Sequence, residues 1–131
     1  MYPKELMSSI YWGFYGGKYK SLKEFNNAVD EYNNEFDVKW NPNEIVLATS
    51  HVTIQYSYWD YEFEEEIEVF FDLTADNTVS FTAGELLFKV HNQVVDNLEN
   101  GPHHLFEGFL LGKRNYHKKN AKPFYFINQG K

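Results

Sequence analysis

Four glutamates at alternating positions are the side chains of this sequence whose spacing points most directly to a function. They are Glu62, Glu64, Glu66 and Glu68. Alternate residues of a β-strand share one face and stand about 6.6 Å apart, so carboxylates in such a row repel one another and disfavour folding. The row is either a solvated face that protects an edge strand from aggregation, or a docking surface for a basic partner. Calcium fits poorly, because a straight row cannot wrap one ion and no loop has the EF-hand pattern.

Aromatic residues stand beside this row, at the expected turn. Tyr56, Tyr58, Trp59 and Tyr61 cluster there around Asp60. Trp and Tyr next to charged side chains have the composition of a binding hot spot, and a carboxylate surface speeds association with a partner of opposite charge. We therefore predict a partner-binding surface that comprises Tyr58, Trp59 and Asp60 together with the four glutamates.

A histidine–glutamate pair is the second candidate for chemistry. His104 and Glu107 follow a Gly-Pro pair that ends a helix, and an imidazole beside a carboxylate can act in general acid–base catalysis. With an aromatic pocket built from Tyr11, Trp12 and Tyr15, this pair defines the alternative hypothesis, an enzymatic or small-molecule-binding domain. No nucleophile context and no glycine-rich phosphate loop accompanies the pair, so we expect a binding protein rather than an enzyme.

The histidine positions do not indicate a metal site. Zinc needs three or four convergent ligands, whereas the spacing of His51, His91, His103 and His104 matches no recognised signature. The chain has no cysteine, which removes disulfides and thiolate ligands. We therefore expect neither a metal nor another cofactor.

The carboxylate row requires a β-hairpin over residues 50–73. Apolar residues occupy the even positions Val52, Ile54 and Tyr56, and after residue 60 they occupy odd positions instead, which is the change of parity that a hairpin needs. A turn centred between residues 59 and 60 fixes the register. On the buried face it pairs Tyr56 with Phe63 and Val52 with Ile67; on the exposed face it pairs Gln55 with Glu64, Thr53 with Glu66 and His51 with Glu68.

The rest of the chain predicts an α+β fold in one domain over residues 1–131. We expect a first helix over 2–14, where Leu6, Ile10 and Phe14 recur at helical spacing, although residues 12–16 also suit an aromatic loop. Capping boxes at Ser21 and Thr82 predict a second helix and a long third helix that ends near residue 98. Strands are expected at 44–49, in the hairpin, at 104–111 and at 123–128. The result is an antiparallel or mixed sheet of about five strands, with two N-terminal helices and one long helix packed on it.

Composition narrows the function further. The chain has 131 residues, 43% hydrophobic residues and a net charge of −7, which favours a folded acidic domain and disfavours nucleic acid or an anionic membrane as the main partner. No segment resembles a signal peptide or a membrane-spanning helix. Residues 40–88 contain no Lys or Arg, whereas residues 113–131 contain no Asp or Glu. The basic segment 113–119 could contact RNA, but a solvated loop facing the acidic hairpin is the simpler interpretation.

Two segments carry a family resemblance. Residues 81–92, FTAGELLFKVHN, and residues 103–109, HHLFEGF, are similar to sequences of immunity proteins from bacterial toxin systems, including contact-dependent inhibition. The resemblance implies a cytosolic protein that binds a cognate toxin domain, often a basic nuclease, and blocks it. It implies no particular site residues. A third hypothesis, an assembly subunit that associates through the strands of residues 44–73, is disfavoured because like charges would meet.

Overall fold

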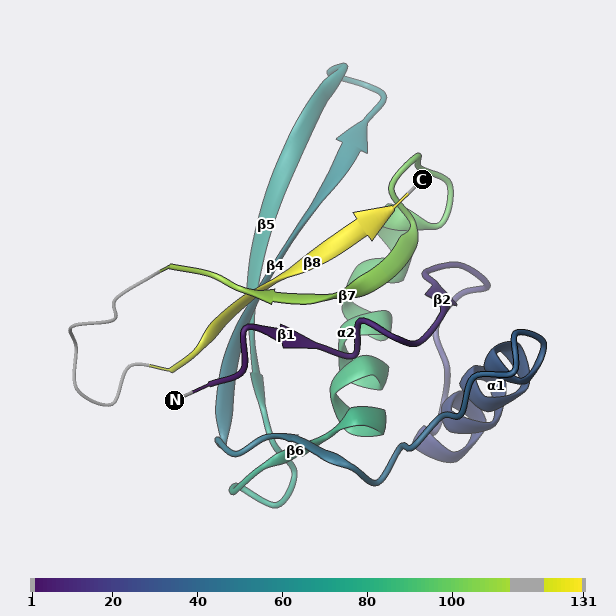
Figure 1. The fold of residues 1–131 in the computed structure, drawn as a ribbon. Helices are drawn as coiled ribbons and strands as arrows, with labels where there is room; N and C mark the ends of the chain where they lie inside the picture. Colours follow the sequence, from purple (N-terminus) through teal and green to yellow (C-terminus); the bar gives the residue numbers. More distant parts are fainter. Residues whose placement is uncertain (1, 114–121, 131) are drawn as a thin grey trace.

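A six-stranded mixed sheet forms the centre of the computed structural model, which describes residues 2–113 and 122–130 (Figure 1). Its strands are β1 (Glu5–Leu6), β2 (Trp12–Gly13), β4 (His51–Asp60), β5 (Glu65–Thr74), β7 (Leu105–Leu111) and β8 (Phe124–Gly130). The strand order is β1-β7-β8-β4-β5, and β2 also pairs with β7. All neighbours are antiparallel except β4 and β8, which run parallel where Thr53 to Gln55 lie beside Phe124 to Phe126. The α+β class and the mixed sheet are thus confirmed.

Two helices complete the fold, and both begin where the capping boxes predicted. In α1 (Leu22–Asn34) the Ser21 hydroxyl accepts a hydrogen bond from Glu24 N at 3.1 Å, and in α2 (Ala83–Leu98) Thr82 Oγ1 accepts one from Glu85 N at 3.2 Å. These bonds satisfy amides that a helix start leaves without partners. The apolar stripe of α2 packs into the core with the sheet, while α1 contacts α2 and β2. A small two-stranded sheet joins β3 (Ile45–Leu47) to β6 (Phe81–Thr82).

The predicted helix over residues 2–14 is wrong, because this segment forms two short strands, β1 and β2, separated by a bend and turn over residues 7–10. Leu6, Ile10 and Phe14 are buried as the pattern indicated, but a turn separates Leu6 from the other two, so their spacing of four does not come from a helical repeat. Trp12, between Ile10 and Phe14, is also buried, although on a helix a side chain two positions away would point to the opposite side. The fold therefore has two helices in the described residues rather than three.

Side-chain amides hold the N-terminal segment against the helices. The Asn33 side chain, fully buried in α1, accepts a hydrogen bond from Tyr11 N at 2.7 Å and donates to Tyr11 O at 2.9 Å. The Asn92 side chain in α2 makes the same pair of bonds to Tyr19, each 3.0 Å long. Each amide thus replaces a neighbouring strand for one residue, and together they fix both ends of residues 11–19.

A charged cluster ties the connection after β5 to the first turns of α2. Lys89 Nζ lies 2.7 Å from Asp76 Oδ1 and 2.8 Å from Glu85 Oε2, and it donates to Thr74 O at 2.7 Å. Burial alone lowers the pKa of Lys89, but hydrogen bonds to the two carboxylates outweigh it and raise that pKa above its ordinary value. Glu85 also accepts from Asp76 N at 2.7 Å. These groups have structural partners, so we assign them to stability rather than to a site.

Candidate functional site

The β4–β5 hairpin has a different register from the predicted one. Its pairs run from His51 opposite Thr74 to Asp60 opposite Glu65, so Tyr56 faces Val69 and not Phe63. The predicted faces hold for the buried side chains Val52, Ile54 and Tyr56, because the shift is an even number of residues. Alternation determines which face a side chain occupies, but it does not fix where the chain turns.

The turn lies at residues 61–64, and Asp60 builds it. Asp60 Oδ1 accepts hydrogen bonds from Glu62 N at 2.9 Å and Phe63 N at 3.3 Å, which is the way Asp side chains support turns. Glu64 adopts a φ of 52° and reverses the chain. Of the predicted row, Glu62 and Glu64 therefore lie in the turn, and only Glu66 and Glu68 share a face of β5. The prediction of a four-member strand row was wrong, and Asp60 has a structural role.

The end of the hairpin projects from the body of the protein (Figure 1). Strand β8 pairs with β4 only over Thr53 to Gln55. Beyond it, the Gln129 side chain accepts from Ser57 N at 2.9 Å and donates to Ser57 O at 2.8 Å. Past Ser57, β4 and β5 have no further strand beside them in the described part of the chain. We call residues 58–66 the hairpin tip.

The hairpin tip exposes two aromatic side chains, Tyr61, which was expected at the turn, and Phe63, which was expected on the buried face. Tyr61 is 66% exposed and Phe63 is 68% exposed, because the turn carries them beyond the core. Tyr58 packs partly against the core beside Tyr56, with ring centroids 6.3 Å apart. Trp59 lies on the opposite face, directly across from Glu66. Asp60, three residues before Phe63, is the signal that could have located the turn correctly.

Carboxylates are the sequence neighbours of these exposed rings. Glu62, Glu64, Glu65 and Glu66 are all exposed, and no Lys or Arg in residues 2–113 or 122–130 forms an ion pair with them. Farther down β5, Glu68 accepts a hydrogen bond from Gln55 at 3.2 Å. The hairpin tip therefore combines exposed aromatic area with negative charge that the described residues do not neutralise.

One cation near the C-terminus does reach β5, but not at the hairpin tip. Lys122 Nζ lies 2.9 Å from Asp72 Oδ2, at the end of β5 away from the turn. Asp72 also accepts from Thr53 Oγ1 at 2.7 Å. The basic segment 113–119, which we expected to face the hairpin, lies outside the described residues except for Lys113.

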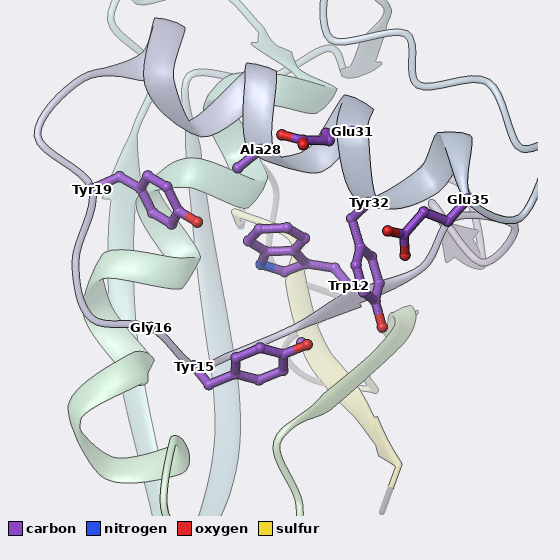
Figure 2. Close-up of a pocket in the computed structure, with 9 residues that line it drawn as sticks. Trp12, Tyr15, Gly16, Tyr19, Ala28, Glu31, Tyr32 and Glu35 are labelled. Carbon is purple, nitrogen blue, oxygen red and sulfur yellow. The ribbon is translucent and has the colours of Figure 1, made fainter.

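A pocket of about 290 Å³ lies between the N-terminal segment and α1 (Figure 2). Its aromatic lining is Trp12, Tyr15, Tyr19 and Tyr32, and Glu31 of α1 and Glu35, the residue that caps the end of α1, also line it. An aromatic pocket around Trp12 and Tyr15 was predicted, but Tyr11 lines a neighbouring hollow and packs against Phe36 at 4.6 Å. Tyr19, Tyr32 and the two glutamates join the pocket lining because α1 packs beside the N-terminal segment, which the sequence did not predict.

Trp12 is oriented in this pocket by a buried histidine. Trp12 Nε1 donates a hydrogen bond to His91 Nδ1 at 3.1 Å, and His91 Nε2 lies 2.8 Å from Gly17 O. Because Nδ1 accepts, the ring proton resides on Nε2 and is donated to Gly17. Burial lowers the pKa of His91, although Gly17 O and the Glu99 carboxylate partly oppose this. The neutral imidazole thus accepts the hydrogen bond of the indole N–H, and the indole ring lines the pocket.

The predicted acid–base pair of His104 and Glu107 is not assembled. His104 Nδ1 lies 3.0 Å from Gly101 O, and its ring packs edge-on against Tyr15 at 5.6 Å. Glu107 lines the neighbouring hollow with Tyr11 instead. His51 hydrogen-bonds with Thr74 Oγ1 at 3.2 Å and lies far along the hairpin from Glu68, as the corrected register requires.

No three His, Asp or Glu side chains in the part of the chain that the structure describes are grouped as metal ligands. Nor does either helix there combine the length and apolar character that crossing a membrane requires. Comparison with protein-family models, with curated proteins and with solved structures finds no match to this chain. Its function must therefore be inferred from the geometry of the hairpin tip and the pocket.

Proposed function

We propose that this protein binds a basic protein through the hairpin tip and thereby neutralises a cognate toxin. The observation that supports this most is the exposure of Tyr61, at 66%, and Phe63, at 68%, on a turn that projects from the fold. Large exposed aromatic side chains contribute nothing to the core of this protein. At the centre of an interface, however, such residues contribute most of the binding energy.

The charge of the hairpin tip indicates the chemistry of the partner. Glu62, Glu64, Glu65 and Glu66 lie within five consecutive exposed positions beside the two rings in the sequence, and like charges so close together disfavour the free protein unless a positive surface relieves them. Lys and Arg on a partner would do so, and would also accelerate association through long-range attraction. Toxins that cleave nucleic acids are often basic, which fits this requirement.

The internal structure of the hairpin supports a binding role as well. Asp60 holds the turn through two backbone amides, and Gln129 holds Ser57 where the sheet ends. The hairpin tip is therefore ordered before binding, and a preordered surface loses less conformational entropy on association. The resemblance to immunity proteins implies the class of partner, a toxin domain, and an interaction in the cytosol.

A pull-down with matched variants tests the proposal. The purified chain is used as bait in extract from its native cell, and the captured protein is identified by mass spectrometry. Bound protein should be basic and toxin-like, and about 0.5 M salt should release it because salt screens exposed charges. Two variants, Glu64→Lys/Glu66→Lys and Tyr61→Ser/Phe63→Ser, should lose it, each weakening affinity by about 2 kcal/mol or more.

The control variant carries the same change of charge elsewhere. Glu24→Lys/Asp30→Lys alters two exposed carboxylates of α1 and should capture the partner as the unmodified chain does. Loss of capture with this control, or unchanged capture with both hairpin-tip variants, contradicts the proposal. Folding of every variant is checked by circular dichroism, so that loss of binding is not confused with loss of structure.

A further inference from the structure

The aromatic pocket is the strongest feature of the molecule that the proposed function does not use. Trp12, only 7% exposed, forms its floor. Around it stand Tyr32, edge-on with ring centroids 5.9 Å apart, and Tyr19, tilted with centroids 6.3 Å apart. Tyr15, which is 44% exposed, stands at the mouth. Figure 2 shows these four rings arranged around one space, contributed by the N-terminal segment and by α1.

The charges of the pocket are all negative. Glu31 of α1 and Glu35, the C-cap residue that follows it, are four positions apart, about one helical turn, and both line the space. No Lys or Arg lines it within the described ranges, and no ion pair with either glutamate occurs there. Lys18, which directly precedes Tyr19 in the sequence, forms an ion pair with Asp96 of α2 at 3.5 Å.

The rings are held in position by contacts outside the pocket. His91 accepts the hydrogen bond of the Trp12 N–H, so Trp12 presents its ring, and not a hydrogen-bond donor, to the pocket. Asn92 holds the backbone of Tyr19 from both sides. Gly13 allows the Tyr15 ring to lie across the backbone, because a Cβ at Gly13 would come within 2.2 Å of Tyr15 Cε1. The pocket is thus preformed, and its shape depends on these supporting residues.

We propose that this pocket binds a methylated ammonium group. The face of an aromatic ring is negative, so several rings around one space attract a cation, and carboxylates at the edge add to the attraction. A methylated ammonium suits the site better than a bare one, because it loses less hydration and offers apolar methyl surface to the rings. The volume of about 290 Å³ is near the lower limit of small-molecule sites, about 300 Å³, and fits one head group. This inference does not depend on the function of the hairpin tip.

Calorimetric titration with four probes tests the inference. Choline carries the trimethylammonium group, and its neutral carbon isostere 3,3-dimethylbutan-1-ol has the same shape without the charge. A peptide with trimethyllysine and the same peptide with unmodified lysine complete the set. Choline or the trimethyllysine peptide should bind at least about tenfold more tightly than its matched partner. The tighter of the two then identifies the source, a free small molecule or a modified protein. Equal binding within both matched pairs, or no binding of either methylated probe at millimolar concentration, overturns the inference.

Variants locate the site. Tyr15→Leu removes an exposed ring but keeps its bulk, and should weaken binding by about two- to fivefold, the usual contribution of one exposed cation–π contact. Glu31→Gln/Glu35→Gln should weaken it by a similar factor. Asp30→Asn changes a neighbouring exposed carboxylate that does not line the pocket, and should leave binding unchanged. Equal weakening by Asp30→Asn, or no effect of either pocket variant, contradicts this location.

Discussion

Trp12 and His91, which are 79 positions apart in sequence, are joined by a buried hydrogen bond of 3.1 Å from the indole Nε1 to the imidazole Nδ1. This bond joins the N-terminal segment to α2 at the floor of the aromatic pocket. It also requires an uncharged imidazole, because a protonated ring would have no lone pair on Nδ1 to accept from Trp12. The protonation of His91 is therefore linked to the stability of the fold.

Stability should fall as the pH decreases below 6.5. The folded protein holds the pKa of His91 below its ordinary value of 6.5, whereas the unfolded chain takes up the proton near that value. The unfolded state then binds more protons, and its advantage grows by at most about 1.4 kcal/mol per pH unit from this one group. Urea unfolding at pH 7.5, 6.5 and 5.5 measures the slope. His91→Gln keeps one acceptor and one donor without titrating, and should flatten the slope; an unchanged slope would exclude His91 as its source.

Loss of the Asn33 side chain should destabilise the protein strongly. Asn33→Ala leaves the N–H and C=O of Tyr11 without their partners, and we expect a loss of about 2–3 kcal/mol in the free energy of unfolding. Asn34→Ala changes the adjacent exposed asparagine and should alter stability by less than about 0.5 kcal/mol. Denaturant titration of the two variants makes the comparison. Similar losses in both would mean that helix propensity, and not the bridge to Tyr11, is responsible.

Gly108 should tolerate no side chain. It has a φ of +100°, it lies where the β7–β8 register shifts, and a Cβ there would approach Leu6 O and Ser8 Cα to 3.0 Å. The backbone angle alone costs about 1–2 kcal/mol for alanine, so Gly108→Ala should lower the melting temperature clearly. A Cβ at Gly101 meets no atom closer than 3.6 Å, and Gly101→Ala is the matched control. A Gly108→Ala variant as stable as that control would contradict the described path of β1.

The hairpin tip should be nearly neutral for stability. Tyr61→Ser/Phe63→Ser removes two rings that are largely exposed, and unfolding free energy should change by less than about 0.5 kcal/mol. Asp60→Ala removes the acceptor for two turn amides and should cost about 1 kcal/mol. Thermal and urea unfolding of both variants test this contrast. A large loss of unfolding free energy in the double variant would show that the two rings stabilise the fold, which would contradict a role in partner binding alone.

The elements of this fold that depend on neighbouring residues could be predicted from the sequence. Ser21 and Thr82 began their helices as expected, since a cap and its helix lie within four residues. The parity of β4 and β5 also located the buried face correctly. The turn position did not follow, because Asp60 was interpreted as part of the turn when it is the residue that precedes and supports it.

Features that depend on distant packing could not be predicted. The parallel pair of β4 and β8 joins Ile54 to Tyr125, and neither local pattern encodes that choice. The conformation of the N-terminal segment depends on Asn33 and Asn92, whose partners are 22 and 73 residues away. The pocket shares this limit, since Trp12 and Tyr15 were recognisable as aromatics but Tyr32 and the two glutamates joined them only through the docking of α1.

Hydrogen exchange of the chain with and without its captured partner tests the central claim most directly. In the free protein, the hairpin tip projects from the fold, and the exchange rates of its backbone amides can be compared with those of α1 in the same sample. If the hairpin tip is the interface, protection on binding should centre on residues 58–66 and leave residues 22–35 unchanged. Protection at the pocket or α1, with the exchange of residues 58–66 unaltered, would contradict a binding role for the hairpin tip.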